Sequence, residues 1–410
     1  MSRTKNYCEN MASRGSIHLS IIFFFLAILP LLASAFPGFF HVENSNSPFQ
    51  NDGVKTFFGA PIFRGKGENE EASLPSDDVG EQEKPLKYES RTKEETGVKG
   101  TTKGRLREGF YEKTCPQAEL IVNDVMNKAF QNDSGLAAAL LRLFFHDCFV
   151  TGCDASILLD KTPGGEEVEK ASGANGMFIR GFEAIDEIKR KLEYECPSVV
   201  SCADILAFAN RESLVFSGLP SYNVAAGRRD SLTSLAKNVE NNVPLPDQTT
   251  QQITALFNRK GLTVEEMVVL TGAHSIGIAH CANIIERFWD QQKRKEIEPG
   301  YHGAVGFSCG NDPEQIFPFD TLTEYKMDSH FYKQVLNKRA LIESDQNMAR
   351  DPQTANIMKT LADDQEGWFG KFIKTIIKLG EIEVLTGDQG EIRKQCRDFN
   401  QNTRGIFGLG

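Results

Sequence analysis

Apolar residues recur at helical spacing through most of the chain beyond residue 110, and this pattern predicts a series of amphipathic helices. The first expected helix runs to Phe130 and has Pro116 in its first turn. Thr263 and Glu266 have the spacing of a capping box, and Gly261 lies where a glycine commonly ends a helix. The other expected helices span 135–147, 182–192, 203–216, 251–260, 263–270, 329–339, 352–362 and 368–379. Alternating strand patterns are nearly absent, so the sequence predicts a mainly α-helical core of about 300 residues.

Two stretches precede this core. Residues 17–35 form an apolar run that ends in Ala33-Ser34-Ala35, so we expect residues 1–35 to be a secretory signal peptide. The run also approaches membrane-spanning length, but Pro30 and the small residues at its end favour cleavage over an uncleaved anchor. Residues 36–105 show no helical or strand period and become almost purely polar, so we expect a disordered, low-complexity extension. A solvated spacer or propeptide fits this composition better than a docking arm. The folded domain is expected at 106–410.

Charge and cysteine content narrow the class of protein. The net charge of −10 argues against a nucleic-acid partner, because such proteins need a basic face. Of nine cysteines, Cys8 lies in the leader, and the remaining eight fit four disulfides in a secreted protein. Eight cysteines allow 105 pairings, and the residues alone do not choose among them.

The segment 140–156 concentrates the candidate chemistry. Arg142 and His146 are four residues apart and share one face of an apolar helix, which is costly unless a polar group lies against them. His274 lies between small residues, as if a flat group approached the backbone closely. No spacing typical of a zinc site is present, so two histidines from distant helices are better placed to flank a planar cofactor. His280, His302 and His330 show no evident partner in the sequence.

Oxygen-bearing residues follow His146. Asp147, Asp154 and Ser156 are expected on a loop that contains Gly152, a combination that suits calcium. The alternative is that they are ordinary helix-end and turn-forming residues. A second oxygen-rich run covers 320–328 and is equally ambiguous by itself.

Read together, the motifs resemble those of the plant secretory (class III) haem peroxidases over roughly 109–400. They are Phe-Tyr-x-x-Thr-Cys-Pro from Phe110, Leu-Arg-Leu-x-Phe-His-Asp-Cys-Phe-Val from Leu141 and Gly-Cys-Asp-Ala-Ser-Ile-Leu-Leu from Gly152. Arg-Gly-Phe at 180–182, Val-Ser-Cys-Ala-Asp-Ile from 200 and Gly-Arg-Arg-Asp from 227 follow. Gly-Ala-His-Ser-Ile-Gly from 272, Ser-Asp-Gln from 344 and Gly-Glu-Ile-Arg-x-x-Cys from 390 complete the order.

The resemblance implies a two-lobed, all-helical fold with haem b between the lobes, and it implies a role for each matching residue. His146 would be the acid–base catalyst, Arg142 would stabilise developing charge, and Asn175 would hold the imidazole of His146. His274 would be the iron ligand, and Asp345 would be the partner of its imidazole. Phe145 and Phe319 would lie next to the haem ring, and Pro244 would contact the reducing substrate.

Two calcium ions and four disulfides also follow from the resemblance. The implied distal calcium ligands are Asp147, Val150, Gly152, Asp154 and Ser156, with Glu169 in the same set. The implied proximal ligands are Ser275, Asp320, Thr323, Lys326 through its carbonyl, and Asp328. The implied disulfides are Cys115–Cys196, Cys148–Cys153, Cys202–Cys396 and Cys281–Cys309.

The chain departs from the family pattern mainly at 290–318, and Asn283 stands where some members have a phenylalanine. None of these departures removes a catalytic group. We therefore expect a secreted monomeric enzyme that uses hydrogen peroxide to oxidise small phenolic donors in the apoplast or cell wall, with the vacuole as another destination. The alternative is a catalytically impaired haem- and calcium-binding wall protein that acts through its N-terminal extension.

Overall fold

The computed structural model describes residues 105–400 except 177 and 311. The predicted signal peptide and nearly all of the predicted extension lie outside the described residues. Twelve α-helices and one two-stranded antiparallel sheet form the described part, so the mainly α-helical prediction is confirmed. The helices are α3 Ala118–Asn132, α4 Leu136–Val150, α5 Phe182–Glu195, α6 Cys202–Phe216, α7 Thr250–Arg259, α8 Val264–Thr271, α9 Ile285–Trp289, α10 Pro299–Cys309, α11 His330–Leu336, α12 Glu343–Arg350, α13 Pro352–Asp363 and α14 Gln365–Leu379. The strands are β1 Ile278–His280 and β2 Ile316–Pro318.

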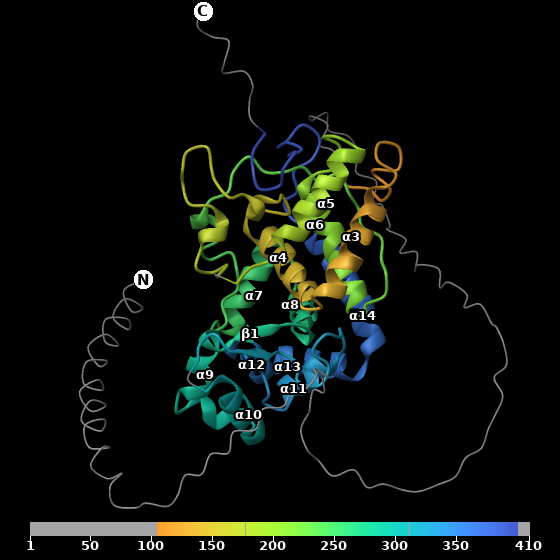
Figure 1. Ribbon diagram of the computed structural model, residues 1–410. Coiled ribbons are helices and arrows are strands. Elements are labelled where there is room, and N and C mark those ends of the chain that lie inside the picture. The colour runs from red at the N-terminus through yellow and green to blue at the C-terminus, as the bar shows by residue number, and fades with distance from the viewer. Residues whose placement is uncertain (1–104, 177, 311, 401–410) are drawn as a thin grey trace, which may run out of the picture. The chain divides into compact units, whose positions relative to one another are not determined.

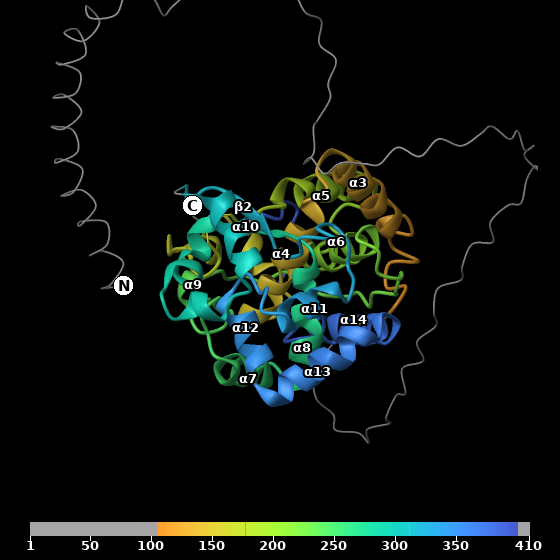
Figure 2. The ribbon, with the colours of Figure 1, turned by 90° about the horizontal axis from the view of Figure 1, so that it is seen from below.

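The helices pack in two groups, which agrees with the expected two-lobed fold. Helices α3, α4, α5 and α6 contact one another, and α7, α8 and α11 to α14 form the second group (Figure 1). One buried apolar cluster contains residues of both groups. A smaller cluster belongs to α9, α10 and the hairpin, and Figure 2 shows α9 and α10 together at one edge of the molecule.

Local sequence explains several helix ends. The capping box of Thr263 and Glu266 is present at the start of α8, as predicted, and Thr249 and Gln252 form a second one at α7. Gly261 has φ +77°, directly after the residue that caps α7, which confirms its predicted position. These signals are local, so they could be read from the sequence.

Helix α4 is buried along most of its length because nearly all its residues are apolar. It packs chiefly on α6. At the start of α5, Gly181 has φ +109°, and a Cβ there would lie 2.8 Å from Cδ2 of Leu140. Glycine therefore lets α5 begin against the wall of α4.

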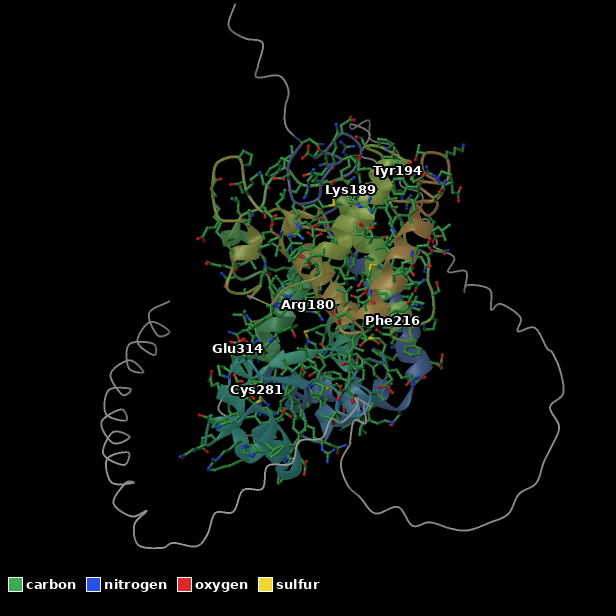
Figure 3. The ribbon with its side chains drawn as sticks, in the orientation of Figure 1. Arg180, Lys189, Tyr194, Phe216, Cys281 and Glu314 are labelled. Carbon is green, nitrogen blue, oxygen red and sulfur yellow. A yellow bond between two sulfur atoms is a disulfide. The ribbon has the colours of Figure 1, made fainter. Side chains whose placement is uncertain are left out.

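Four disulfides link the described chain, and they pair the same cysteines that the resemblance implies. Cys202–Cys396 closes the longest loop, with a sequence separation of 194, and Cys115–Cys196 closes one of 81. Cys281–Cys309 joins the end of β1 to α10, and Figure 3 shows Cys281 on the side of the molecule away from Lys189 of α5.

Several predicted helices need correction; for example, α5 ends three residues later and α14 begins three residues earlier than predicted. Pro116 lies two residues before α3 rather than in its first turn. Helix α4 continues to Val150, so Asp147 belongs to its last turn and not to the following loop. Helix α11 ends at Leu336, three residues before the predicted end. Helices α9, α10 and α12 were not predicted, because α9 and α12 are short and α10 carries several glycines, which weaken the helical signal.

Among the described helices, none has the length and hydrophobicity needed to cross a membrane.

Candidate active site

Asn175 joins the two polar groups of α4. Its side-chain Oδ1 lies 2.7 Å from Nδ1 of His146, and its main-chain oxygen accepts a hydrogen bond of 2.6 Å from Arg142. Its Nδ2 in turn donates to the main-chain oxygen of Glu169 at 2.6 Å. Two of these hydrogen bonds join Arg142, His146 and Asn175 into one connected unit, and the third attaches this unit to Glu169.

The contact with Asn175 sets the state of the His146 imidazole. Since a carboxamide oxygen only accepts, the proton is assigned to Nδ1, and Nε2 keeps its lone pair free. Burial, followed by the nearby charge of Arg142, lowers the pKa of His146 to about 3, while the hydrogen bond to Asn175 acts in the opposite direction. The imidazole is therefore neutral at ordinary pH and can accept a proton at Nε2.

Arg142 supplies a positive charge beside this base. Solvent reaches its side chain, yet protein atoms surround the guanidinium closely enough that burial lowers its pKa. The group remains charged, because an arginine pKa starts above 12. The ring of Phe145, whose centroid is 6.0 Å from that of His146, stacks on Phe149 with centroids 4.2 Å apart.

The second histidine, His274, lies in the turn after α8. Its Nδ1 is 3.0 Å from Oδ2 of Asp345, a carboxylate that is 1% exposed at the start of α12. Its ring stacks on Phe319 at 4.4 Å and 10°. Nε2 has no hydrogen-bond partner within the described part of the chain, and the imidazole is partly exposed. His274 therefore presents a free Nε2 that is backed by an anion.

The glycines around His274 serve protein packing. A Cβ at Gly272 would lie 2.5 Å from the hydroxyl of Tyr332 and 2.6 Å from the ring of Trp368. Gly277 has φ +95°, and a Cβ there would lie 3.0 Å from Cβ of Ala138 in α4. We expected the small residues around His274 to make room for a planar cofactor. At Gly272 this interpretation is corrected, because Tyr332 and Trp368 fill the space. Gly277 brings the segment after His274 against the helix that carries Arg142 and His146.

The predicted distal oxygen ligands lie close together and are buried. Asp147 accepts the main-chain N–H groups of Ala155 and Ile157, and Asp154 accepts that of Ser156. The Ser156 hydroxyl donates to Oε2 of Glu169, while Oε1 of Glu169 is buried without a hydrogen-bond partner in the described chain. Burial, then the charge of Asp147, raises the pKa of Glu169 to about 9.

The pKa values of Asp147 and Asp154 are also raised. Burial, followed by the charge of Asp154, raises the pKa of Asp147, and burial raises that of Asp154. The cluster therefore holds three carboxyl groups whose ionised form the surrounding protein does not stabilise. Within the described residues, no group of three His, Cys, Asp or Glu side chains could hold a metal by itself. A cation here would need hydroxyl and main-chain oxygens as well, such as those of Ser156, Val150 and Gly152.

The predicted proximal ligands gather beside His274. The Ser275 hydroxyl donates to the main-chain oxygen of Lys326 at 2.9 Å and accepts the main-chain N–H of Asp328. Thr323 has a buried hydroxyl oxygen with no partner among the described residues. Asp320 is fully buried and binds His330.

Two contacts in this region were missed by sequence reasoning. His330, for which no partner was evident, lies 2.8 Å from Asp320, and no local sequence signal marks this pair. His280 stacks on Phe178 with centroids 3.5 Å apart and rings 11° from parallel. Phe178 follows Asn175 by three residues, so this stack ties the segment that holds His146 to strand β1.

Pro244 lies in the connection before α7 and is half-buried. Two residues later, the main-chain oxygen of Pro246 accepts the N–H of Ser344, directly before Asp345. The Pro244 segment is thereby fixed to α12.

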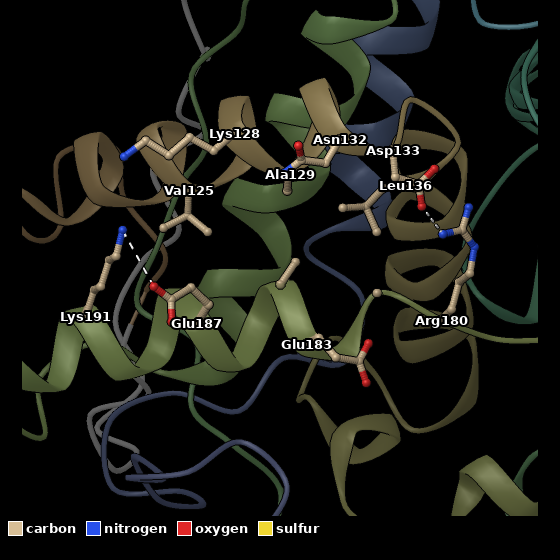
Figure 4. A pocket seen from close by; sticks show the side chains of 12 residues that line it. Val125, Lys128, Ala129, Asn132, Asp133, Leu136, Arg180, Glu183, Glu187 and Lys191 are labelled. Atoms are coloured by element: carbon tan, nitrogen blue, oxygen red, sulfur yellow. Dashed lines mark hydrogen bonds and ion pairs between the residues drawn. The ribbon is translucent and has the colours of Figure 1, made fainter. Parts of the chain in front are cut away.

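A hollow of about 490 Å³ lies between α3 and α5, where Val125, Leu136 and Ala184 meet the charged Arg180 and Lys191 (Figure 4). None of its lining residues belongs to the predicted site. The candidate chemistry therefore does not take place in this hollow.

The two histidines fit the haem iron chemistry that the resemblance implies. One imidazole, His274, has a free Nε2 and an anionic partner on Nδ1, which is the arrangement of a metal-binding histidine. The other, His146, has a free Nε2 and is kept neutral beside a cation. Phe319 and Phe145 add ring surfaces next to them.

Comparisons with known proteins agree with this geometry. The sequence profile described as "Peroxidase" matches residues 122–364. "Peroxidase 15" of Arabidopsis thaliana is 40% identical over 311 residues, which cover 74% of this chain and 91% of the relative. "Peroxidase 5" of Vitis vinifera is 41% identical over 303 residues, or 72% and 92% of the two chains. "Peroxidase 1" of Zea mays is 39% identical over 311 residues, or 73% and 84%.

A profile match over more than half of the chain, and relatives that are covered almost entirely, agree with the motifs and with the paired histidines. The chain belongs to the peroxidase family and is a haem peroxidase of the plant class III type.

Proposed function

We propose that His146 is the acid–base catalyst of this peroxidase, that Arg142 is its charge-stabilising partner, and that phenolic molecules are its electron donors. The overall reaction converts one hydrogen peroxide and two donor molecules to two waters and two one-electron-oxidised donors. When bound at His274, haem supplies the iron that peroxide oxidises by two electrons and that donors reduce in two single steps.

The observation that carries this proposal is the connected unit of Arg142, His146 and Asn175. Nε2 of His146 can take a proton from one oxygen of peroxide and return it to the other, which then leaves as water. The guanidinium of Arg142 can stabilise the negative charge that develops as the O–O bond breaks. Asn175 holds both groups in register.

His274 and Asp345 have supporting roles in the proposal. Nε2 of His274 would bind the iron, and the carboxylate of Asp345 would give the imidazole anionic character through Nδ1. Phe319 would hold the orientation of the His274 ring, and Phe145 would cover the haem on the side of His146. Pro244 would contact the donor.

We include two calcium ions in the proposal. The distal one is supported by the buried carboxylates of Asp147 and Asp154 and by the unpaired oxygen of Glu169. The proximal one is supported by Ser275, Asp320, the unpaired hydroxyl of Thr323, Lys326 and Asp328. Oxygen donors of this kind suit calcium. Secretion, and a monomeric enzyme in the apoplast or vacuole, complete the proposal and are in keeping with four disulfides.

The decisive experiment compares the wild type with His146→Leu in stopped-flow mixing with peroxide. We expect the first oxidation step, followed at the haem absorption band, to slow by about 10²- to 10⁴-fold in the variant. His302→Leu is the control for the loss of a histidine elsewhere, because His302 lies in α10 and contacts the main-chain oxygen of Phe288 in α9. An unchanged rate in His146→Leu would remove His146 from the proposed role.

Guaiacol oxidation by the haem-loaded wild type tests the phenolic donors. The alternative of an impaired wall protein predicts no turnover here. The intact contacts of Arg142, His146 and Asn175 do not favour that alternative.

A further inference from the structure

His330 contacts both carboxylate oxygens of Asp320, a member of the proximal calcium set. Its Nδ1 lies 2.8 Å from Oδ2 and 3.0 Å from Oδ1 of that carboxylate, which is fully buried. Since a carboxylate oxygen only accepts, the proton between the two groups is assigned to Nδ1. The contact is therefore a hydrogen bond that His330 donates to Asp320.

Asp320 has little capacity left for another partner. Its Oδ1 also accepts the main-chain N–H groups of Leu322 at 2.8 Å and Thr323 at 3.1 Å. An ionised carboxylate offers about four lone-pair positions, and Oδ1 alone has three donors around it. Asp328 is also engaged, because its Oδ1 accepts the main-chain N–H of His330 at 2.9 Å.

The distal set has no such partner. Within the described part of the chain, Asp147 accepts only main-chain N–H groups, and Asp154 accepts a main-chain N–H and the hydroxyl of Thr151. Among the described residues, no Lys, Arg or His side chain is bonded to the carboxylates of Asp147, Asp154 or Glu169; Arg393 instead donates to the main-chain oxygen of Asp154. The distal carboxylates therefore keep oxygens available for a cation.

We propose that His330 competes with calcium for Asp320 and makes the proximal calcium site the weaker of the two. This inference rests on the calcium sites of the proposed function and ranks them. To ligate calcium fully, Asp320 must release or share its bond to His330. The imidazole is partly exposed, with 28% of its side chain accessible, so it can turn toward solvent when the ion binds.

The test measures calcium binding and not turnover. Wild-type holoenzyme and the His330→Leu variant are dialysed against graded concentrations of EGTA, and bound calcium is measured by atomic emission. Calcium titration of the depleted proteins by calorimetry then gives the dissociation constants. For the wild type we expect one tight and one weaker ion. In His330→Leu the weaker constant should fall by about tenfold, because the hydrogen bond to Asp320 no longer opposes the ion.

Controls separate this effect from a general change in the protein. The tighter constant should be the same in wild type and His330→Leu, since the distal set is untouched. His302→Leu removes a half-buried histidine elsewhere and should change neither constant. His330→Gln retains a weaker donor and should give a smaller increase in affinity, which provides a second variant if the leucine disturbs folding.

Two results would overturn the inference: equal affinities for both ions in the wild type, or a weaker site that is unchanged in both His330 variants. A wild type that binds no calcium would overturn it together with the calcium sites, while leaving the roles of His146 and Arg142 to their own kinetic test.

Discussion

Nδ1 of His146 lies 2.7 Å from Oδ1 of Asn175, and this contact decides which nitrogen of the imidazole is free to react. Asn175 is itself fixed, because its Nδ2 donates to the main-chain oxygen of Glu169. The orientation of the base therefore depends on residues outside α4. Glu169 also belongs to the predicted distal calcium set, so the base and the ion site share a support.

Replacing Asn175 by leucine should slow the peroxide step more than the donor step. The substitution leaves the Nδ1–H of His146 buried without an acceptor, and it removes the hydrogen bond that favours protonation of the ring. A hydrogen bond of about 1.4 kcal/mol corresponds to a tenfold effect, so we expect at least about a tenfold loss in the peroxide rate constant. Stopped-flow mixing measures it. An Asn175→Asp variant retains an acceptor and should lose less; equal losses in both variants would argue against this role.

The rate constant of the peroxide step should not change as the pH falls from neutral to roughly one unit above the pKa of His146. The surroundings of His146 lower this pKa to about 3. The base works only when neutral, so an ordinary histidine would lose activity below its usual pKa of about 6.5. Stopped-flow rates across pH 3–8 test this, and an acid limb near 6.5 would contradict it. Arg142→Gln removes a charge that lowers this pKa, so the acid limb of that variant should move to higher pH.

The same shift has a defined effect on stability. Between the unfolded pKa of about 6.5 and the folded pKa of about 3, the unfolded chain binds a proton at His146 that the folded chain does not. This group therefore reduces the free energy of unfolding as pH falls through 6.5.

Much of the architecture could be predicted from the sequence, because it depends on local signals. The capping box of Thr263 and Glu266 and the glycine at 261 needed only their neighbours. Helices α9, α10 and α12 were missed, because α9 and α12 are short and the glycines of α10 weaken its signal. Helices α9 and α10 pack in the smaller apolar cluster beside the disulfide of Cys281, and α12 packs on α11 and α13; periodicity does not reveal such contacts.

The site residues show the same division. Arg142 and His146 could be chosen from the sequence, because their spacing places them on one helical face. The partner of His330 could not, since the fold brings Asp320 to it and a hydrogen bond leaves no periodic pattern. The small residues around His274 were interpreted as room for a flat group, whereas at Gly272 the rings of Tyr332 and Trp368, distant in sequence, fill the space.

Asp345→Asn should weaken iron binding and raise the reduction potential of the haem iron. The amide cannot supply the anionic partner that the Nδ1–H of His274 now has, so the imidazole becomes a poorer donor to oxidised iron. We expect about a 10- to 100-fold faster transfer of haem to an acceptor protein, followed by absorbance. Spectroelectrochemistry measures the reduction potential. Asp345→Glu, which retains the charge, should lie between the two. A potential unchanged in the asparagine variant would contradict the prediction.

Removing the Cys202–Cys396 disulfide should destabilise the protein more than removing Cys148–Cys153. The first closes a loop with a separation of 194 and the second one of 5. Loop-closure entropy assigns them about 5 and about 2 kcal/mol, respectively. Paired Cys→Ala variants in urea unfolding give the comparison. A larger loss from the short loop would show that local strain or the calcium segment, and not chain entropy, dominates.

Removing calcium should lower turnover before haem is lost. Asp147 follows His146 in the last turn of α4, and its carboxylate ties that turn to the main chain at Ala155 and Ile157. Without the ion, burial favours protonation of Asp147 and Asp154, with the nearby charge of Asp154 adding to the effect at Asp147, and this change should displace the turn that aims His146. Guaiacol oxidation and haem absorbance, followed together during EGTA treatment, should therefore separate in time, with activity falling first and returning when calcium is added. If the proximal ion leaves first, as proposed from His330, activity should persist until the second ion is released, because only the distal set borders His146. Full activity in protein shown to have lost both ions would refute this coupling.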